Sequence, residues 1–299
     1  MKQQTLKKNY SFEGKGLHTG CPARLTLRPA EADSGIRFFR TDLGSAEIPA
    51  LAKNVSSTAR STTLSCGEAS VSTVEHLLSA LTGLGVDNVR IELEGPEVPI
   101  LDGSALPYVE AVLADGLQEL SAERRMIVLP RPVEIRYENT GSWVRITPAE
   151  SLSYELTVDF GSHVLGVQTA CWDGGPEYAG EIAPCRTFCF FHELEFLASQ
   201  GLVKGGDVDN AIVIVEHPVS EEQLERMRLT FGQRKLGVTP EGYLSNLKLR
   251  FPNECGRHKL LDLIGDLRLV GGFLQARIEA YKPGHGINTQ AAKAVLNLI

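Results

Sequence analysis

Short runs of alternating apolar and polar residues fill the first 65 residues of the chain, and this period-two pattern predicts β-strands. The clearest runs are residues 5–14, 23–29 and 36–40, with turn-forming residues between them. The period then becomes helical over about 73–84, where one face carries Val74, Leu77, Leu78 and Leu81. A strand over 88–95 and a helix beginning near Leu106 complete this part of the chain.

A polar segment at 119–125 leads into a second series of elements, and we place a domain boundary there. The predicted domains are residues 1–122 and 123–299. The second begins with strands over 126–137, 143–149 and 154–160, followed by a strand–helix–strand excursion over about 186–215. Beyond it we predict a polar helix with a capping box at Ser220 and Gln223, a helix over about 256–270, a strand over 274–282 and a last helix.

The two halves repeat one order of elements. In each, a helix that carries a histidine leads to a strand, a glycine-containing turn and another helix. From His76 to Asp102 in the first turn the offset is 26 residues, and from His258 to His285 in the second it is 27. Two domains of like topology that face each other would bring these motifs together.

Composition limits the classes of function. With 299 residues, 42% hydrophobic and 22% charged, the chain is an ordinary globular protein of about two domains. Its net charge of −7 argues against nucleic acid as the main partner. The six cysteines form no C-x-x-C pair, and the N-terminus lacks the apolar core of a secretory signal. Charged residues interrupt the longest apolar stretches, so we predict a cytoplasmic protein without stable membrane insertion.

Two distant motifs indicate a metal site. His258 and Asp262 are four residues apart on a predicted helix, so both side chains lie on one face. His76 would complete a three-ligand set with a fourth position open, as in catalytic zinc sites. Glu75 is then a candidate base for a water molecule. The alternatives are a capping box between Ser72 and Glu75, and histidines that merely satisfy their helices.

A fourth motif supplies a candidate acid. His285 lies between Gly284 and Gly286, where the backbone can approach a ligand closely, although a tight turn with an exposed imidazole is the plainer interpretation. Asp266, one turn beyond Asp262, is placed to orient His285 or a ligand, or is simply a solvated acid. Lys259 and Lys282 suit an anionic substrate, although surface lysines are common.

Six segments in this order resemble one enzyme family. They are STVEHLLSALTGLGVDN, PILDGSALPYVEA, RTFCFF, GGDVDNAIV, RHKLLDLIGDL and YKPGHGIN, and the similarity extends over about 5–296. The chain is similar to the zinc-dependent UDP-3-O-acyl-N-acetylglucosamine deacetylases of lipid A biosynthesis. The resemblance implies an α+β fold of two domains with similar topology, each a helix layer on a mostly antiparallel sheet with a small insert. The active site would lie between them.

The resemblance also implies residue roles. The zinc ligands would be His76, His258 and Asp262. Glu75 would be the general base, His285 the general acid held by Asp266, and Thr187 an oxyanion contact. The sugar-nucleotide contacts would be Lys259, Phe188 and Lys282.

The second insert would form a passage for the fatty acyl chain, lined by Leu194, Val203, Val208 and Val213. The alternative is that these residues only pack the insert together. Two features depart from the family pattern. Glu193 stands where many members have aspartate, and the stretch over 217–253 is long. That long stretch resembles versions fused to a dehydratase domain, which we do not expect within these 299 residues.

The sequence therefore predicts an enzyme that releases acetate from the N-acetyl group of UDP-3-O-acyl-N-acetylglucosamine, with Zn²⁺ as cofactor and a monomeric chain. Two alternatives remain open: a zinc amidohydrolase that acts on another acylated sugar, and a non-catalytic, metal-stabilised binding domain.

Overall fold

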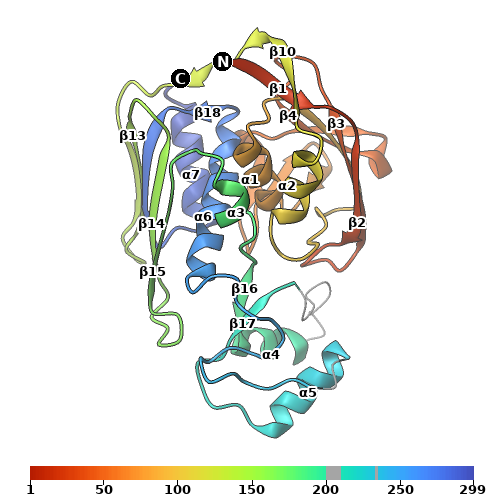
Figure 1. Cartoon of the computed structure of the whole chain (residues 1–299), viewed down its shortest axis with the longest axis vertical. Coiled ribbons are helices and arrows are strands. Elements are labelled where there is room, and N and C mark those ends of the chain that lie inside the picture. The colour runs from red at the N-terminus through yellow and green to blue at the C-terminus, as the bar shows by residue number, and fades with distance from the viewer. Residues whose placement is uncertain (200–209, 233–234) are drawn as a thin grey trace.

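The computed structural model describes residues 1–199, 210–232 and 235–299, without the side chains of 196–199. Two five-stranded sheets form its outer layers (Figure 1). The order in the first sheet is β2 (Tyr10–Lys15), β3 (Pro22–Pro29), β9 (Val89–Glu94), β4 (Ile36–Arg40) and β5 (Ala46–Pro49). The central strand β9 runs antiparallel to β3 and parallel to β4.

The second sheet repeats this plan. Its order is β12 (Val133–Tyr137), β13 (Ser142–Pro148), β19 (Ala276–Tyr281), β14 (Ser153–Asp159) and β15 (Val167–Trp172). The central strand β19 is again antiparallel to one neighbour, β13, and parallel to the other, β14. In both sheets the central strand is the last of the five along the chain, and it follows the histidine-bearing helix. The predicted α+β fold with two halves of similar topology is confirmed.

Helices of both halves lie between the two sheets (Figure 1). They include α1 (Glu75–Leu84), α2 (Leu106–Leu113), α6 (Glu254–Leu267) and α7 (His285–Leu296). Helices α1 and α6 pack directly against each other, and a Cβ added at Gly265 of α6 would lie 2.0 Å from the carbonyl oxygen of Glu75. Burial of Leu77, Leu81 and Ile264 anchors this junction. The close approach brings the motif of each half to the same place.

Each half carries an insert. In the first, β6 (Val55–Ser57), β7 (Thr63–Cys66) and β8 (Ala69–Val71) form a small sheet. In the second, β16 (Phe188–Phe190), α4 (Phe191–Ser199) and β17 (Ile212–Ile214) form the predicted strand–helix–strand unit, with the two strands parallel. This unit and α5 (Glu221–Phe231) project as a separate lobe at the bottom of Figure 1. The predicted capping box of α5 is present.

Some elements differ from the prediction. The expected strand over 5–14 is two strands, β1 (Lys2–Leu6) and β2, which belong to different sheets. The partner of β1 is β10 (Leu117–Glu123), so the polar connection predicted there is partly a strand. Most residues of β10 are exposed or half-buried, which explains the missing apolar signal. The strand expected over 126–137 is likewise two strands in different sheets, β11 (Met126–Ile127) and β12, and the one expected over 274–282 divides into β18 (Phe273–Leu274) and β19. The elements not predicted at all include β15 and α3 (Tyr178–Glu181).

The domain boundary near residue 122 remains a prediction. Within the described parts of the chain, no helix has the length and apolar character that crossing a membrane requires.

Candidate metal centre and its surroundings

His76, His258 and Asp262 form a buried cluster where α1 meets α6. The Oδ1 atom of Asp262 lies 3.7 Å from Nε2 of His76 and 3.5 Å from Nε2 of His258. A tetrahedral ion with ligand bonds of about 2.0–2.2 Å holds its ligand atoms roughly 3.3–3.6 Å apart. The three side chains are therefore spaced to hold one divalent ion.

The protonation states suit metal binding. Burial and the neighbouring His258 lower the pKa of His76 to about 3, and burial also lowers the pKa of His258. Burial alone would raise the pKa of Asp262, but Lys259 and His258 outweigh it and lower this pKa. Two neutral imidazoles and a carboxylate thus face one another at neutral pH, which is a donor set that zinc accepts.

Outer contacts fix the orientation of these ligands. The Nδ1 atom of His258 is 3.0 Å from the carbonyl oxygen of Cys185, so Nδ1 carries the proton and Nε2 is free to bind. Lys259 donates from Nζ to Oδ2 of Asp262 at 2.7 Å. No hydrogen bond reaches Oδ1 of Asp262 within the described residues, although this atom is buried. An unpartnered buried carboxylate oxygen is costly, and a bound cation would satisfy it.

Glu75 does not form the alternative capping box. Its Oε2 accepts a hydrogen bond from the backbone N–H of Thr62 at 3.0 Å, and the hydroxyl of Ser72 bonds the carbonyl of Pro96 instead. The side chain is buried beside the cluster. Burial raises the pKa of Glu75 to about 7, with Asp266 and Asp262 adding to the shift and His285 opposing it. A carboxyl group with this pKa is suited to accept a proton near neutral pH.

His285 opens helix α7 rather than an exposed turn, and its side chain is 10% exposed. Its Nδ1 lies 2.9 Å from Oδ2 of Asp266, and its Nε2 lies 3.8 Å from Oε1 of Glu75. Burial alone would lower the pKa of His285, but the carboxylates of Asp266 and Glu75 outweigh it and raise this pKa to about 9. Asp266 is buried and is not the solvated acid of the plainer interpretation. The imidazolium and the carboxylate of Glu75 lie beside each other at the metal cluster.

The remaining predicted contacts lie at different distances from the cluster. The ring of Phe188 is 6.2 Å from that of His258, and Nζ of Lys259 lies 5.5 Å from the Phe188 ring centre. The backbone N–H of Thr187 donates to the carbonyl of Gly103 at 2.8 Å, which links the second insert to the first half of the chain. Phe188 and Lys259 border the cluster.

Lys282 is placed differently. Its Nζ pairs with Asp159 at 3.2 Å, and within the described residues it forms no ion pair with a residue of the cluster. Phe160, which follows Asp159, packs its ring 5.5 Å from that of Phe188. Through Asp159, Lys282 thus adjoins the segment whose Phe160 packs against Phe188.

Comparison with known proteins identifies the family. The family model described as "LpxC: UDP-3-O-acyl N-acetylglycosamine deacetylase" matches residues 3–236 and 232–297. The chain belongs to the LpxC family. It is 43% identical over 294 residues to the bifunctional enzyme LpxC/FabZ of Bacteroides thetaiotaomicron, with 98% of this chain and 64% of that protein covered. The chain thus spans less than two thirds of that bifunctional relative.

Relatives that are named only as deacetylases match over more of their own length. The chain is 42% identical over 295 residues to the UDP-3-O-acyl-N-acetylglucosamine deacetylase of Anaeromyxobacter dehalogenans, covering 98% of this chain and 87% of that one. It is 39% identical over 305 residues to the protein of the same name from Trichormus variabilis, covering 100% and 99%.

Two residues of this LpxC-family site were missed from sequence. Burial lowers the pKa of His18, and this residue is close enough to His285 and Arg60 for their charges to act in the same direction. The signal available was its Gly-Leu-His-Thr-Gly setting, which resembles the glycine-flanked His285. Thr62 contacts both Glu75 and Asp266, and nothing in its local sequence marks it.

Of the residues predicted to line an acyl passage, Leu194 and Val213 lie in the lobe. Val203 and Val208 fall outside the described residues. Leu194 and Val213 are buried in a cluster that the lobe builds for itself, with Phe191, Val215, Leu224, Met227, Leu236 and Leu244. Helix α5 thus supplies part of the packing around Val213. A role in binding an acyl chain remains a prediction for both described residues.

A bulky substitution at Val213 distinguishes a role in packing the lobe from a role in lining the acyl passage. We expect Val213→Phe to destabilise the protein by roughly 1–3 kcal/mol, because it overpacks a filled cluster. Val215→Phe is the matched control, since Val215 is buried in the same cluster. If Val213 also lines the passage, its variant alone will favour substrates with shorter acyl chains, as measured by KM across chain lengths. Identical chain-length preference in both variants would remove Val213 from the passage.

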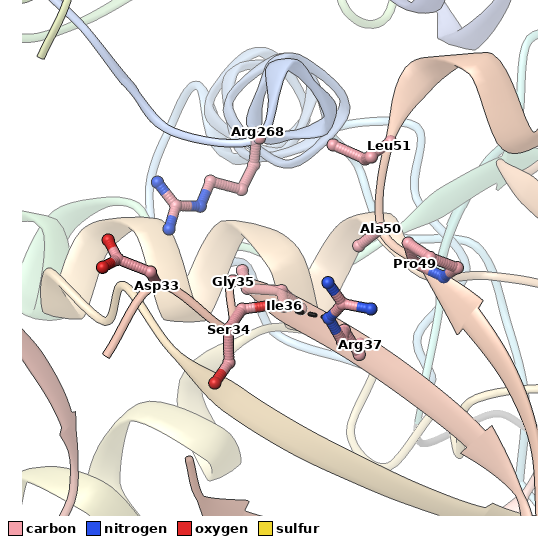
Figure 2. Close-up of a pocket in the computed structure, with 10 residues that line it drawn as sticks. Asp33, Ser34, Gly35, Ile36, Arg37, Pro49, Ala50, Leu51 and Arg268 are labelled. Carbon is pink, nitrogen blue, oxygen red and sulfur yellow. Dashed lines mark hydrogen bonds between the residues drawn. The ribbon is translucent and has the colours of Figure 1, made fainter. Parts of the chain in front are cut away.

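A separate cavity of about 160 Å³ lies between the two halves, at the other end of α6 (Figure 2). Its lining comes from the segments around Ser34 and Ala50 and from Arg268 and Gly271. Arg268 is buried and donates to the carbonyl of Val86 at 2.8 Å, so it links the second half to the first. None of the metal-cluster residues lines this cavity, which sets it apart from the candidate centre.

Proposed function

We propose that this LpxC-family chain hydrolyses the N-acetyl group of UDP-3-O-acyl-N-acetylglucosamine and releases acetate, as a step of lipid A biosynthesis. The observation that carries the proposal is the buried cluster of His76, His258 and Asp262 with Glu75 and His285 beside it. The names of the relatives supply the substrate class.

We propose zinc as the cofactor, held by His76, His258 and Asp262. Two imidazoles, one carboxylate and an open position are a usual set for catalytic zinc. The ion would polarise the amide carbonyl and lower the pKa of a bound water molecule towards neutrality.

The chain's own residues would move the protons. Glu75 takes a proton from the attacking water, for which its raised pKa suits it. The hydroxyl of Thr187 donates to the oxyanion that forms at the amide carbon. His285 gives its proton to the departing amine, which is necessary because an amide anion is a very poor leaving group. Asp266 holds Nδ1 of His285, so that Nε2 faces the reacting groups.

The side chains around the cluster are the proposed substrate contacts. Phe188 and Lys259 are proposed to meet the sugar nucleotide beside the cluster, and Lys282 to meet it farther out. A nucleotide head and one acyl chain require no stable membrane insertion, so we propose a cytoplasmic enzyme. Because both halves of the site come from one chain, we propose that a monomer is active.

The pH profile of kcat tests the two proton-transfer roles. Activity should rise as the pH passes about 7, because Glu75 must lose its proton to act as a base. It should fall as the pH passes about 9, because His285 must keep its proton to act as an acid. His285→Ala should lower kcat and weaken or move the basic limb. An unchanged profile in that variant would exclude His285 from the chemistry.

The activity assay separates the alternatives. Acetate release from UDP-3-O-acyl-N-acetylglucosamine, lost after complete metal removal and restored by zinc, is the expected result. Turnover of a different acylated sugar, without turnover of this substrate, would favour the other amidohydrolase. Stoichiometric metal without turnover of either substrate would favour the binding domain.

A further inference from the structure

Thr62 joins the candidate base to the partner of the candidate acid. It lies in the first insert, just before β7, and its side chain is fully buried. Its backbone N–H donates to Oε2 of Glu75 at 3.0 Å, and its hydroxyl donates to Oδ1 of Asp266 at 2.5 Å. Glu75 belongs to the first half of the molecule and Asp266 to the second, so one residue is bonded to both halves of the site.

The backbone of Thr62 also contacts the start of α1. Its carbonyl oxygen accepts the backbone N–H of Val74 at 3.4 Å, immediately before α1. The loop of the first insert is thereby fixed to the start of the helix that carries Glu75 and His76. A shift of this loop would change the positions of both acceptors of Thr62.

The hydroxyl completes the set of donors around Asp266. The Oδ2 atom of that carboxylate lies 2.9 Å from Nδ1 of His285 and accepts from Nδ2 of Asn288 at 3.0 Å, which leaves Oδ1 to Thr62. Hydrogen bonds to both oxygens fix the plane of this carboxyl group. The direction of the His285 ring depends on that plane, because Asp266 holds its Nδ1.

We propose that Thr62 is a positioning residue for the deacetylase reaction. Its hydroxyl fixes the position of Asp266 and, through Asp266, the direction of the His285 ring. Its backbone N–H holds Glu75, so that one residue keeps the base and the acid aligned. This inference rests on the proposed roles of Glu75 and His285. It assigns to the small first insert a part in aligning the base and the acid across the junction of the two halves.

Thr62→Val isolates the hydroxyl. Valine has nearly the shape of threonine and keeps the backbone N–H to Glu75, so the bond to Asp266 alone is lost. We expect kcat to fall about 10- to 100-fold, the usual cost of removing an outer hydrogen-bond partner. KM and zinc content should change by less than about twofold. Thr62→Ser keeps a hydroxyl and should recover most of the lost kcat.

A matched control uses another buried threonine. Thr82 lies near the far end of α1, and its hydroxyl bonds the carbonyl of Leu78. Thr82→Val therefore removes one buried hydroxyl from the same helix layer without touching Asp266, and should leave kcat unchanged. If Thr62→Val does not fold, Thr62→Ala carries the same comparison.

A double variant distinguishes positioning from a general structural role. With Asp266→Ala in place, Thr62→Val should cost less than about twofold in kcat, because its target is gone. Two independent, additive losses would overturn the inference, as would a wild-type kcat in Thr62→Val. If Glu75 and His285 variants lose activity while Thr62→Val does not, the inference about Thr62 alone fails. If those variants remain active, the proposed function itself fails.

Discussion

Replacing Glu75 by glutamine is expected to lower kcat for acetate release at least about 100-fold while the metal stays bound. Glutamine has the same shape and can still accept the hydrogen bond from the N–H of Thr62, but it cannot take a proton from water. The three proposed ligand atoms are unchanged in this variant. Steady-state kinetics, metal content per chain and melting temperature together check the prediction.

The control is a carboxylate at the opposite end of α1. Asp87 follows that helix and pairs with Arg124 at 2.7 Å, whereas Glu75 and His76 begin the same helix. Asp87→Asn should lower the melting temperature without lowering kcat. If Glu75→Gln behaves in this way instead, with normal kcat and lower stability, Glu75 is a structural residue and not the base.

Loss of a proposed ligand is expected to have the second large effect. His258→Ala and Asp262→Ala should each lose the metal and, with it, more activity than the 10- to 100-fold that an outer partner costs. In addition, Asp262→Ala removes the ion partner of Lys259, whose Nζ lies 2.7 Å from Oδ2. A charge left without its buried partner destabilises the fold, so this variant should also unfold more readily than His258→Ala.

Lys259→Met provides the control for that second effect. It removes the ion pair but leaves all three ligand atoms, so it should retain metal. Elemental analysis of the purified variants gives the metal content. A stoichiometric metal in either ligand variant, together with activity near that of the wild type, would exclude the residue from the metal site.

The proposed metal ligands could be predicted from the sequence because helical spacing and the internal repeat place them together. His258 and Asp262 are four residues apart on α6, and helical spacing alone places them on one face. The similar offsets in the two halves indicated that His76 would join them, and the matching strand orders of the two sheets are the structural basis of that repeat. The family resemblance supplied the roles, and the geometry brings those residues together.

Contacts between residues that are distant in sequence could not be predicted from the sequence. Thr62 is distant in sequence from Asp266, and only the folding of the first insert onto α1 and α6 brings them together. The pairing of β1 with β10 joins two segments from the ends of the first half, one of them largely exposed, so no apolar period marks it. For Val213, apolar character fits both a packed cluster and a passage, and its burial with α5 residues became visible only in three dimensions.

Anomalous diffraction from a metal-replete crystal at the zinc absorption edge would show whether these three residues hold the metal. We expect one strong peak inside the triangle of His76 Nε2, His258 Nε2 and Asp262 Oδ1, at bonding distances of about 2.0–2.2 Å from each. A metal-replete sample with no zinc peak in that triangle would contradict the account.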